Sequence, residues 1–120
     1  MEQAQSFKRV ALVVEEDARH RASITTLLEE SEVQVIQCES GEAAELVLDH
    51  VGGCLIALIA DVDLAGRMDG LELAQIAKQR FPELRVVIMS VNSRISRLPD
   101  GTQFLAKPWS PLDLLRETLH

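Results

Sequence analysis

The sequence predicts an α/β domain in which helices cover both faces of a five-stranded parallel sheet. Apolar runs of strand length alternate along the chain with segments whose apolar residues have helical spacing. The run from Cys54 to Ala60 contains no polar residue and stops at Asp61, which is typical of a strand buried on both faces. The 120 residues contain no repeat or linker, so we expect a single domain with right-handed crossovers.

The first predicted strand, Arg9–Val14, is rich in β-branched residues. Asp17 follows it and is predicted to cap a helix that buries Ile24 and Leu28. Residues 1–7, which precede the strand, are expected to form a flexible tail.

The second predicted strand is Val33–Cys38, and its two glutamines, Gln34 and Gln37, favour a position at the edge of the sheet. Ser40 is predicted to begin the next helix, and Gly52-Gly53 to end it. The buried central strand then follows.

The second half of the chain continues the alternation. A helix is predicted to begin after Asp69-Gly70 and to end near Phe81-Pro82. The remaining strands are predicted at Arg85–Met89 and Gln103–Ala106. Ser110 is then expected to cap the last helix, because a proline and an acidic residue follow it at the usual positions.

The connection between the fourth and fifth strands is expected to be mostly irregular. Only residues 91–102 lie between Ser90 and Gln103, close to the roughly 10–12 residues that a whole crossover needs. Leu98–Gly101 is typical of a turn. We therefore expect at most a short helical turn around Ser93–Arg97.

Composition and charge exclude several classes of function. The formal net charge of −7 argues against general nucleic-acid binding, because phosphates must be met by Lys and Arg. No signal peptide and no run of membrane-spanning length is present, which favours a soluble, cytoplasmic protein. Cys38 and Cys54 both lie in apolar runs, so we expect buried, free thiols and consider a disulfide less favoured.

Polar side chains lie at the ends of four predicted strands, whose carboxyl ends share one edge of the sheet. These residues are Glu15 and Glu16 after the first strand, Asp61 after the third, Ser90 after the fourth and Lys107 after the fifth. Each alone has an ordinary structural explanation, such as a helix cap or a turn. Because all of them lie at strand ends that share one edge of the sheet, we favour a functional explanation.

The chemistry of this edge follows from its charges. Carboxylates packed together repel one another, which should raise the pKa of at least one of them. Lys107 and a bound Mg²⁺ would relieve the repulsion. A carboxylate beside magnesium and a lysine can attack a phosphoryl group and form an acyl phosphate, with the Ser90 hydroxyl donating to a phosphoryl oxygen.

Four motifs together resemble the response regulator receiver domain of two-component signalling, over nearly the whole chain. The motifs are L-V-V-E-E-D, D-V-D-L-A-G-R-M-D-G, V-V-I-M-S and F-L-A-K-P-W. The resemblance implies a doubly wound, flavodoxin-like sheet of strand order 2-1-3-4-5 with five surrounding helices. It also implies a histidine kinase or phosphotransfer protein as phosphodonor and a downstream protein partner; the net charge and the lack of a membrane-spanning run predict no nucleic-acid or membrane partner. The oligomeric state stays open.

By motif position, the resemblance implies Asp61 as the phosphoacceptor and Mg²⁺ as the cofactor. The metal ligands would be Glu15, Glu16, Asp61 and the carbonyl of Asp63. The remaining implied roles are those of Ser90 as the hydroxyl that moves to the phosphoryl group, Phe104 as the aromatic switch, Lys107 as the phosphate-binding lysine and Pro108, whose cis bond positions that lysine.

The sequence departs from the family pattern in several places. Glu16 replaces the usual aspartate, Val91 replaces a small residue, Ala65 stands where proline is frequent, and Phe104 lacks a hydroxyl. The loop after Asp61 is one residue longer, and the stretch from Ser90 to Lys107 is several residues shorter. Because magnesium tolerates little deviation from octahedral geometry, the longer glutamate predicts weak or water-mediated metal binding.

Three alternatives remain beside a phosphoacceptor switch, which would not be an enzyme. A receiver that signals without phosphorylation would agree with Glu16 and Val91. The motif D-V-D-L also resembles aspartate-nucleophile phosphatases of the haloacid-dehalogenase type, but Asp61 follows the third strand and the chain is too short for a cap domain. Flavin binding suits the fold, yet the acidic residues after the first strand would repel its phosphate.

Overall fold

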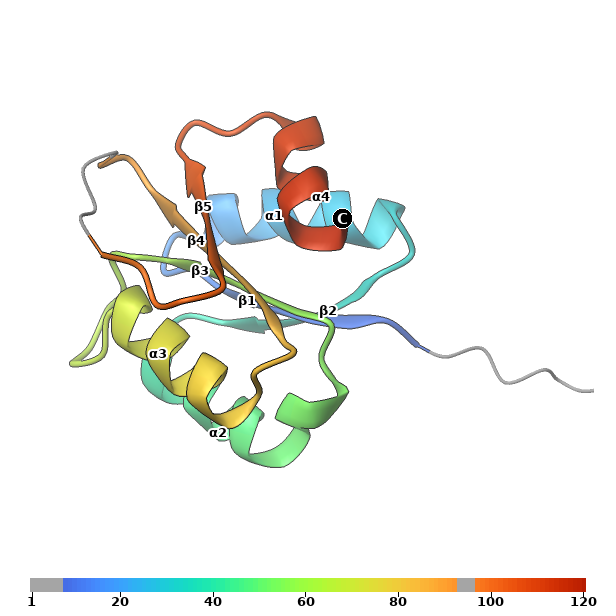
Figure 1. Ribbon diagram of the computed structural model, residues 1–120. Coiled ribbons are helices and arrows are strands. Elements are labelled where there is room, and N and C mark those ends of the chain that lie inside the picture. The colour runs from blue at the N-terminus through green and yellow to red at the C-terminus, as the bar shows by residue number, and fades with distance from the viewer. Residues whose placement is uncertain (1–7, 93–96) are drawn as a thin grey trace, which may run out of the picture.

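The five strands of the computed structural model form one parallel sheet (Figure 1). The structure describes residues 8–92 and 97–120. The strands are β1 (Val10–Val14), β2 (Gln34–Cys38), β3 (Ala57–Asp61), β4 (Arg85–Ser90) and β5 (Thr102–Ala106). Their spatial order, β2-β1-β3-β4-β5, confirms the predicted topology and places β2 at an edge.

Helices cover both faces of the sheet, with α1 and α4 on one side and α2 and α3 on the other (Figure 1). Their bounds are Ala18–Glu30 for α1, Gly41–Val51 for α2, Gly70–Arg80 for α3 and Pro111–Leu119 for α4. The predicted caps Asp17, Ser40 and Ser110 each accept backbone N–H groups of the following helix. No helix within the described ranges is long and apolar enough to cross a membrane.

Alternate residues of the strands pack on opposite faces, as the period of two requires. Leu12, Leu58 and Ile88 are fully buried toward α2 and α3. Their chain neighbours Val13, Ile59 and Met89 are fully buried toward α1 and α4. Each such side chain contributes about 1.5–3 kcal/mol of burial free energy, so the three central strands form a rigid base for the residues at their ends.

The central strand is shorter than predicted, and one cysteine is misplaced in the prediction. Residues Gly52–Cys54 form a short 3₁₀ helix, η1, and β3 begins only at Ala57. Gly52 lies against the ring of Phe81, where an added Cβ would lie 2.3 Å from a ring carbon, so this close approach requires a residue without a side chain. Cys54 is therefore exposed, whereas Cys38 is buried as predicted, and both thiols are free.

The connection between β4 and β5 differs from the five-helix arrangement that the resemblance implies. The described residues form four α-helices, and residues 91–92 and 97–101 are not helical. The connection ends in a turn in which the N–H of Thr102 donates to the carbonyl of Pro99 at 3.1 Å, and Gly101 has a φ of +82°. The helical turn predicted at Ser93–Arg97 lies almost wholly outside the described residues.

Candidate functional site

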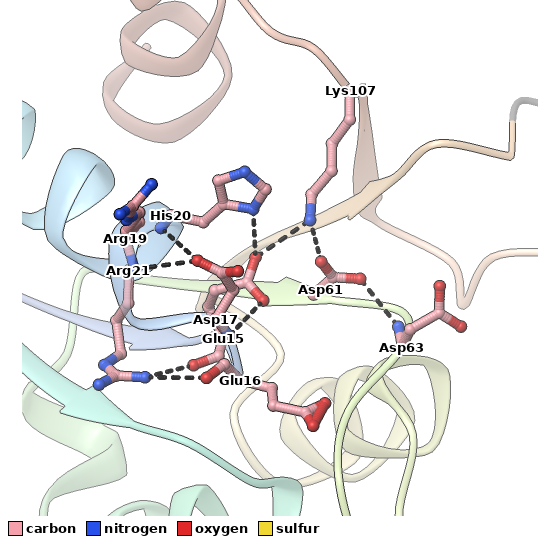
Figure 2. A network of polar contacts seen from close by, with 9 residues as sticks. All are labelled: Glu15, Glu16, Asp17, Arg19, His20, Arg21, Asp61, Asp63 and Lys107. Carbon is pink, nitrogen blue, oxygen red and sulfur yellow. Dashed lines mark hydrogen bonds and ion pairs between the residues drawn. The ribbon is translucent and has the colours of Figure 1, made fainter.

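Four of the residues predicted to share an edge of the sheet do meet there (Figure 2 shows three of them). Asp61 is the last residue of β3 and Ser90 the last of β4, while Glu15 and Lys107 directly follow β1 and β5. Glu15, Asp61 and Ser90 are 3%, 5% and 2% exposed. The N–H of Lys107 donates to the carbonyl of Ser90 at 2.9 Å, which extends the β4–β5 pairing by one residue.

The ammonium of Lys107 joins two carboxylates from different strands (Figure 2). Its Nζ donates to Glu15 Oε1 at 3.0 Å and also to Asp61 Oδ2. Burial lowers the pKa of Lys107, but the hydrogen bonds to Asp61 and Glu15 outweigh it, so the net pKa is raised. The lysine is therefore charged at neutral pH and balances the acidic edge.

Glu15 shows the raised carboxyl pKa that the sequence predicts, with a different main cause. Burial raises the pKa of Glu15, the hydrogen bond from Lys107 offsets this only in part, and the charge of Asp61 is a smaller contribution. Glu15 Oε2 also accepts the N–H of Asp17 at 3.2 Å. The carboxylate is thus fixed by its own loop and by the lysine.

Two residues at this edge were not predicted from the sequence. Nη1 of Arg21 donates to the carbonyl of Glu15 at 2.7 Å and lies 3.4 Å from that of Glu16. Nδ1 of His20 lies 3.7 Å from Glu15 Oε1. Both are placed by the first turns of α1, and their spacing from the acidic pair along a predicted helix is the only signal that could have indicated them.

The predicted metal ligands are brought to one edge without forming a cage of side chains. Glu16 is exposed, and its carboxylate points away from Lys107 (Figure 2). The N–H of Asp63 donates to Asp61 Oδ1 at 2.8 Å, so the main chain of Asp63 faces the phosphoacceptor candidate. Across residues 8–92 and 97–120, no three His, Cys, Asp or Glu side chains are grouped to hold a metal ion. The carboxylate oxygens of Glu15 and Asp61 still fit Mg²⁺, which keeps several waters and needs few protein ligands.

The other residues with predicted roles lie around the same edge. Ser90 Oγ accepts the N–H of Asn92 at 2.9 Å, which leaves the hydroxyl hydrogen for another acceptor. Val91 is 74% exposed, and Phe104 is half-buried in β5. The peptide bond from Lys107 to Pro108 is cis, as the resemblance implies.

Helix α3 begins directly against the backbone of Asp61. The N–H of Gly70 donates to the carbonyl of Val62 at 2.9 Å, and an added Cβ at Gly70 would lie 2.1 Å from the carbonyl oxygen of Asp61. Asp69 and Glu72 form a reciprocal capping box at this helix start. A residue without a side chain at position 70 is therefore required for Asp61 to occupy its place.

Comparison with known proteins identifies the family. The family model described as the response regulator receiver domain matches residues 11–118. The two-component response regulator ORR5 of Oryza sativa subsp. japonica is 34% identical over 112 residues, which cover 88% of this chain and 82% of that protein. The response regulator protein FleR of Pseudomonas aeruginosa is 29% identical over 109 residues. That match covers 87% of this chain but only 22% of FleR.

A solved structure supports the fold independently of sequence. The CheX-CheY-BeF3-Mg complex from Borrelia burgdorferi contains a chain that matches with a TM-score of 0.81 at 17% identity, over 91% of this chain and 85% of that one. Because the family model spans nearly the whole described fold, the chain belongs to the response regulator receiver domains of two-component signalling.

Proposed function

We propose that Asp61 accepts a phosphoryl group from a histidine kinase or a phosphotransfer protein, and that the altered surface then binds a downstream protein. Receiver domains are signalling switches, generally not enzymes, and they bind Mg²⁺ at the phosphorylation site. The observation that carries the proposal for this chain is the contact of Lys107 with both Asp61 and Glu15, which come from separate strands. A simple ion pair needs only two groups, whereas here the ends of three strands contribute charged side chains to one buried cluster.

The residues at the edge provide the chemistry of phosphoryl transfer. An oxygen of the Asp61 carboxylate would attack the phosphorus of a phosphohistidine, the P–N bond would break, and the imidazole nitrogen would keep the electron pair. Lys107 would exchange its contact with Asp61 for one with a phosphoryl oxygen and would keep its contact with Glu15. The Ser90 hydroxyl would donate to another phosphoryl oxygen.

Magnesium is part of the proposal. Glu15, Glu16, Asp61 and the carbonyl of Asp63 would hold it, and when bound it would neutralise the phosphoryl charge. The two free cysteines agree with a reducing compartment, and we propose a cytoplasmic location on that ground and on the family.

The direct test is the intact mass of the protein after incubation with acetyl phosphate or phosphoramidate and Mg²⁺. The expected result is a gain of one phosphoryl group, because Asp61 has a lysine on one side and oxygen ligands on the other. The gain should disappear in Asp61→Asn and persist in Asp63→Asn, a matched carboxylate two residues along the same loop. No gain in the wild type, or a gain that persists in Asp61→Asn, would contradict the proposal.

A second candidate is a receiver that binds its partner without phosphorylation. The exposed Glu16 and the lack of a grouped set of metal-binding side chains in the described part of the chain favour it. The same experiment separates the two functions, since this second receiver would gain no phosphoryl group on incubation with phosphodonor and Mg²⁺. An aspartate-nucleophile phosphatase is less favoured, because Asp61 ends the third strand of a receiver fold.

A further inference from the structure

The loop between β3 and α3, residues 62–69, is tied to the start of helix α2. Glu42 lies in the first turn of α2, and its Oε2 accepts the N–H of Arg67 at 2.8 Å and that of Met68 at 3.2 Å. These bonds join positions 25 and 26 residues apart in sequence. A carboxylate that accepts two backbone N–H groups forms charge-assisted bonds, which are stronger than neutral ones.

The packing around this contact is close on both sides. An added Cβ at Gly41 would lie 3.0 Å from Met68, so α2 and the loop approach as nearly as a glycine allows. Ser40, which caps α2, forms an isolated parallel bridge with Ala65. Gly66 has a φ of +94°, and an added Cβ there would lie 2.7 Å from Glu42 Oε1. The loop is therefore shaped around the Glu42 carboxylate.

The first residues of the same loop reach the phosphoacceptor. The N–H of Asp63 donates to Asp61 Oδ1, and the N–H of Val62 donates to the carbonyl of Met89 at 2.9 Å. The path from Glu42 to Asp61 thus runs through one short stretch of backbone. A change in the tether at residues 67–68 would be felt at residues 61–63.

We propose that Glu42 is a positioning residue of the phosphoacceptor site, which holds loop 62–69 so that the main chain of Asp63 stays at the acidic edge. This inference rests on the proposed function. The sequence predicts a loop one residue longer than the common family pattern, and a tether would limit the added freedom of its backbone. The hydrogen bond from Arg67 lowers the pKa of Glu42, so the carboxylate is ionised at neutral pH and available to hold the loop.

The test compares Glu42→Ala with Glu29→Ala. Glu29 is also an exposed helical glutamate, and its side chain makes no hydrogen bond or ion pair with the described residues, so it controls for the lost charge. Magnesium is titrated without phosphodonor and followed by NMR at the backbone amides of the loop. In Glu42→Ala, we expect affinity for Mg²⁺ to fall about tenfold, as is usual when a group that supports a metal ligand is lost. Hydrogen-exchange protection of the Arg67 and Met68 amides should fall as well.

Two further variants make the test independent of one substitution. Glu42→Gln keeps one acceptor oxygen and should lose less affinity than Glu42→Ala. Gly66→Ala forces the carboxylate away and should reproduce the loss of Glu42→Ala. In a variant that combines Glu42→Ala with Gly66→Ala, the second substitution should add little to the loss of Mg²⁺ affinity, because both substitutions remove the same contact.

The outcomes separate this inference from the proposed function. A wild type that neither responds to Mg²⁺ nor accepts a phosphoryl group refutes the proposed function and this inference with it. A wild type that does both, with Mg²⁺ affinity equal in Glu42→Ala and Glu29→Ala, refutes only the positioning role. Loss of affinity in Glu42→Ala alone, with retained secondary structure, supports it.

Discussion

The sequence predicts that two connections at the carboxyl edge of the sheet depart from the usual receiver pattern in opposite directions, the β3–α3 loop being longer and the β4–β5 connection shorter. The β3–α3 loop, residues 62–69, is the longer one, and its last residues are held by Glu42 at Arg67 and Met68 and by a capping box at Asp69. The β4–β5 connection, residues 91–101, is shorter, and its described part has no helix and ends in a turn at Gly101. Both connections border the same acidic edge.

The geometry of the site depends on strand register more than on the length of the loops that border it. Strands β4 and β5 remain paired from Val86 with Thr102 to Ser90 with Ala106, so Lys107 still arrives beside the end of β4. A shortened connection is tolerated because it leaves this register intact. A lengthened one is tolerated because α2 supplies an acceptor for two of its amides.

The largest loss of stability is expected from a substitution at the junction of the β3–α3 loop with α3. Gly70→Ala places a Cβ 2.1 Å from the carbonyl oxygen of Asp61 and 2.9 Å from the Cα of Val62. Because backbone atoms cannot move aside as a flexible side chain can, we expect a loss of about 3 kcal/mol in the free energy of unfolding. Urea denaturation measures it, and phosphorylation of Asp61 should slow in whatever protein remains folded.

The control for this variant is Gly53→Ala. An added Cβ at Gly53 would lie 3.9 Å from the ring of Phe81, an ordinary van der Waals distance. Equal losses of stability in Gly70→Ala and Gly53→Ala would show that close packing of α3 on Asp61 is not the cause.

One alanine substitution in each connection tests whether the two connections differ in their effect on the site. Gly66 and Gly101 both have positive φ, at +94° and +82°. Alanine at either position should cost about 1–2 kcal/mol in the free energy of unfolding, since the left-handed region is unfavourable for any residue with a Cβ. Thermal or urea unfolding checks this part of the prediction.

The same pair should differ in metal binding. Gly66→Ala disturbs the Glu42 contact, whereas a Cβ at Gly101 would meet the end of the Lys78 side chain, at 3.1 Å, among the described residues. We therefore expect Mg²⁺ affinity to fall in Gly66→Ala and to stay at the wild-type value in Gly101→Ala. Equal changes in the two variants would mean that general destabilisation, and not loop position, controls the metal site.

The sequence was informative where one physical signal dominated. Continuous apolar runs gave β1, β3 and β4 because a strand buried on both faces has no room for polar residues. Polar residues directly after such runs had to share an edge once the sheet was parallel, which placed Glu15, Asp61 and Lys107 together. The predicted start of β3 at Cys54 was wrong, because apolar residues occur both in a buried strand and in the segment that precedes Ala57, where β3 begins.

The contacts that support the site could not be predicted in the same way. Glu42 meets Arg67 and Met68 across 25 and 26 residues, and the first turn of a helix is an ordinary place for a glutamate. The contact of Gly70 with the backbone of Asp61 could not be predicted either, because Asp-Gly before a helix is explained equally well by a helix cap. Such roles depend on contacts between segments that are far apart in the sequence, and a local sequence pattern does not predict which segments will meet.

The smallest expected effect is a pH dependence of amide protection in the β3–α3 loop, which the β4–β5 connection should lack. The hydrogen bond from Arg67 and the other backbone contacts lower the pKa of Glu42 below its ordinary value of 4.5. A lowered folded-state pKa means that the stabilising contact is fully present above pH 4.5 and is lost as the pH falls through the folded-state pKa. Protection factors of the Arg67 and Met68 amides, measured by hydrogen exchange, should therefore be constant near neutral pH and fall in acid. The amide of Thr102, whose acceptor is the carbonyl of Pro99, should show no such fall, and Glu42→Gln should abolish the dependence. If the Arg67 amide in Glu42→Gln lost protection over the same pH range as in the wild type, another group would have to be responsible.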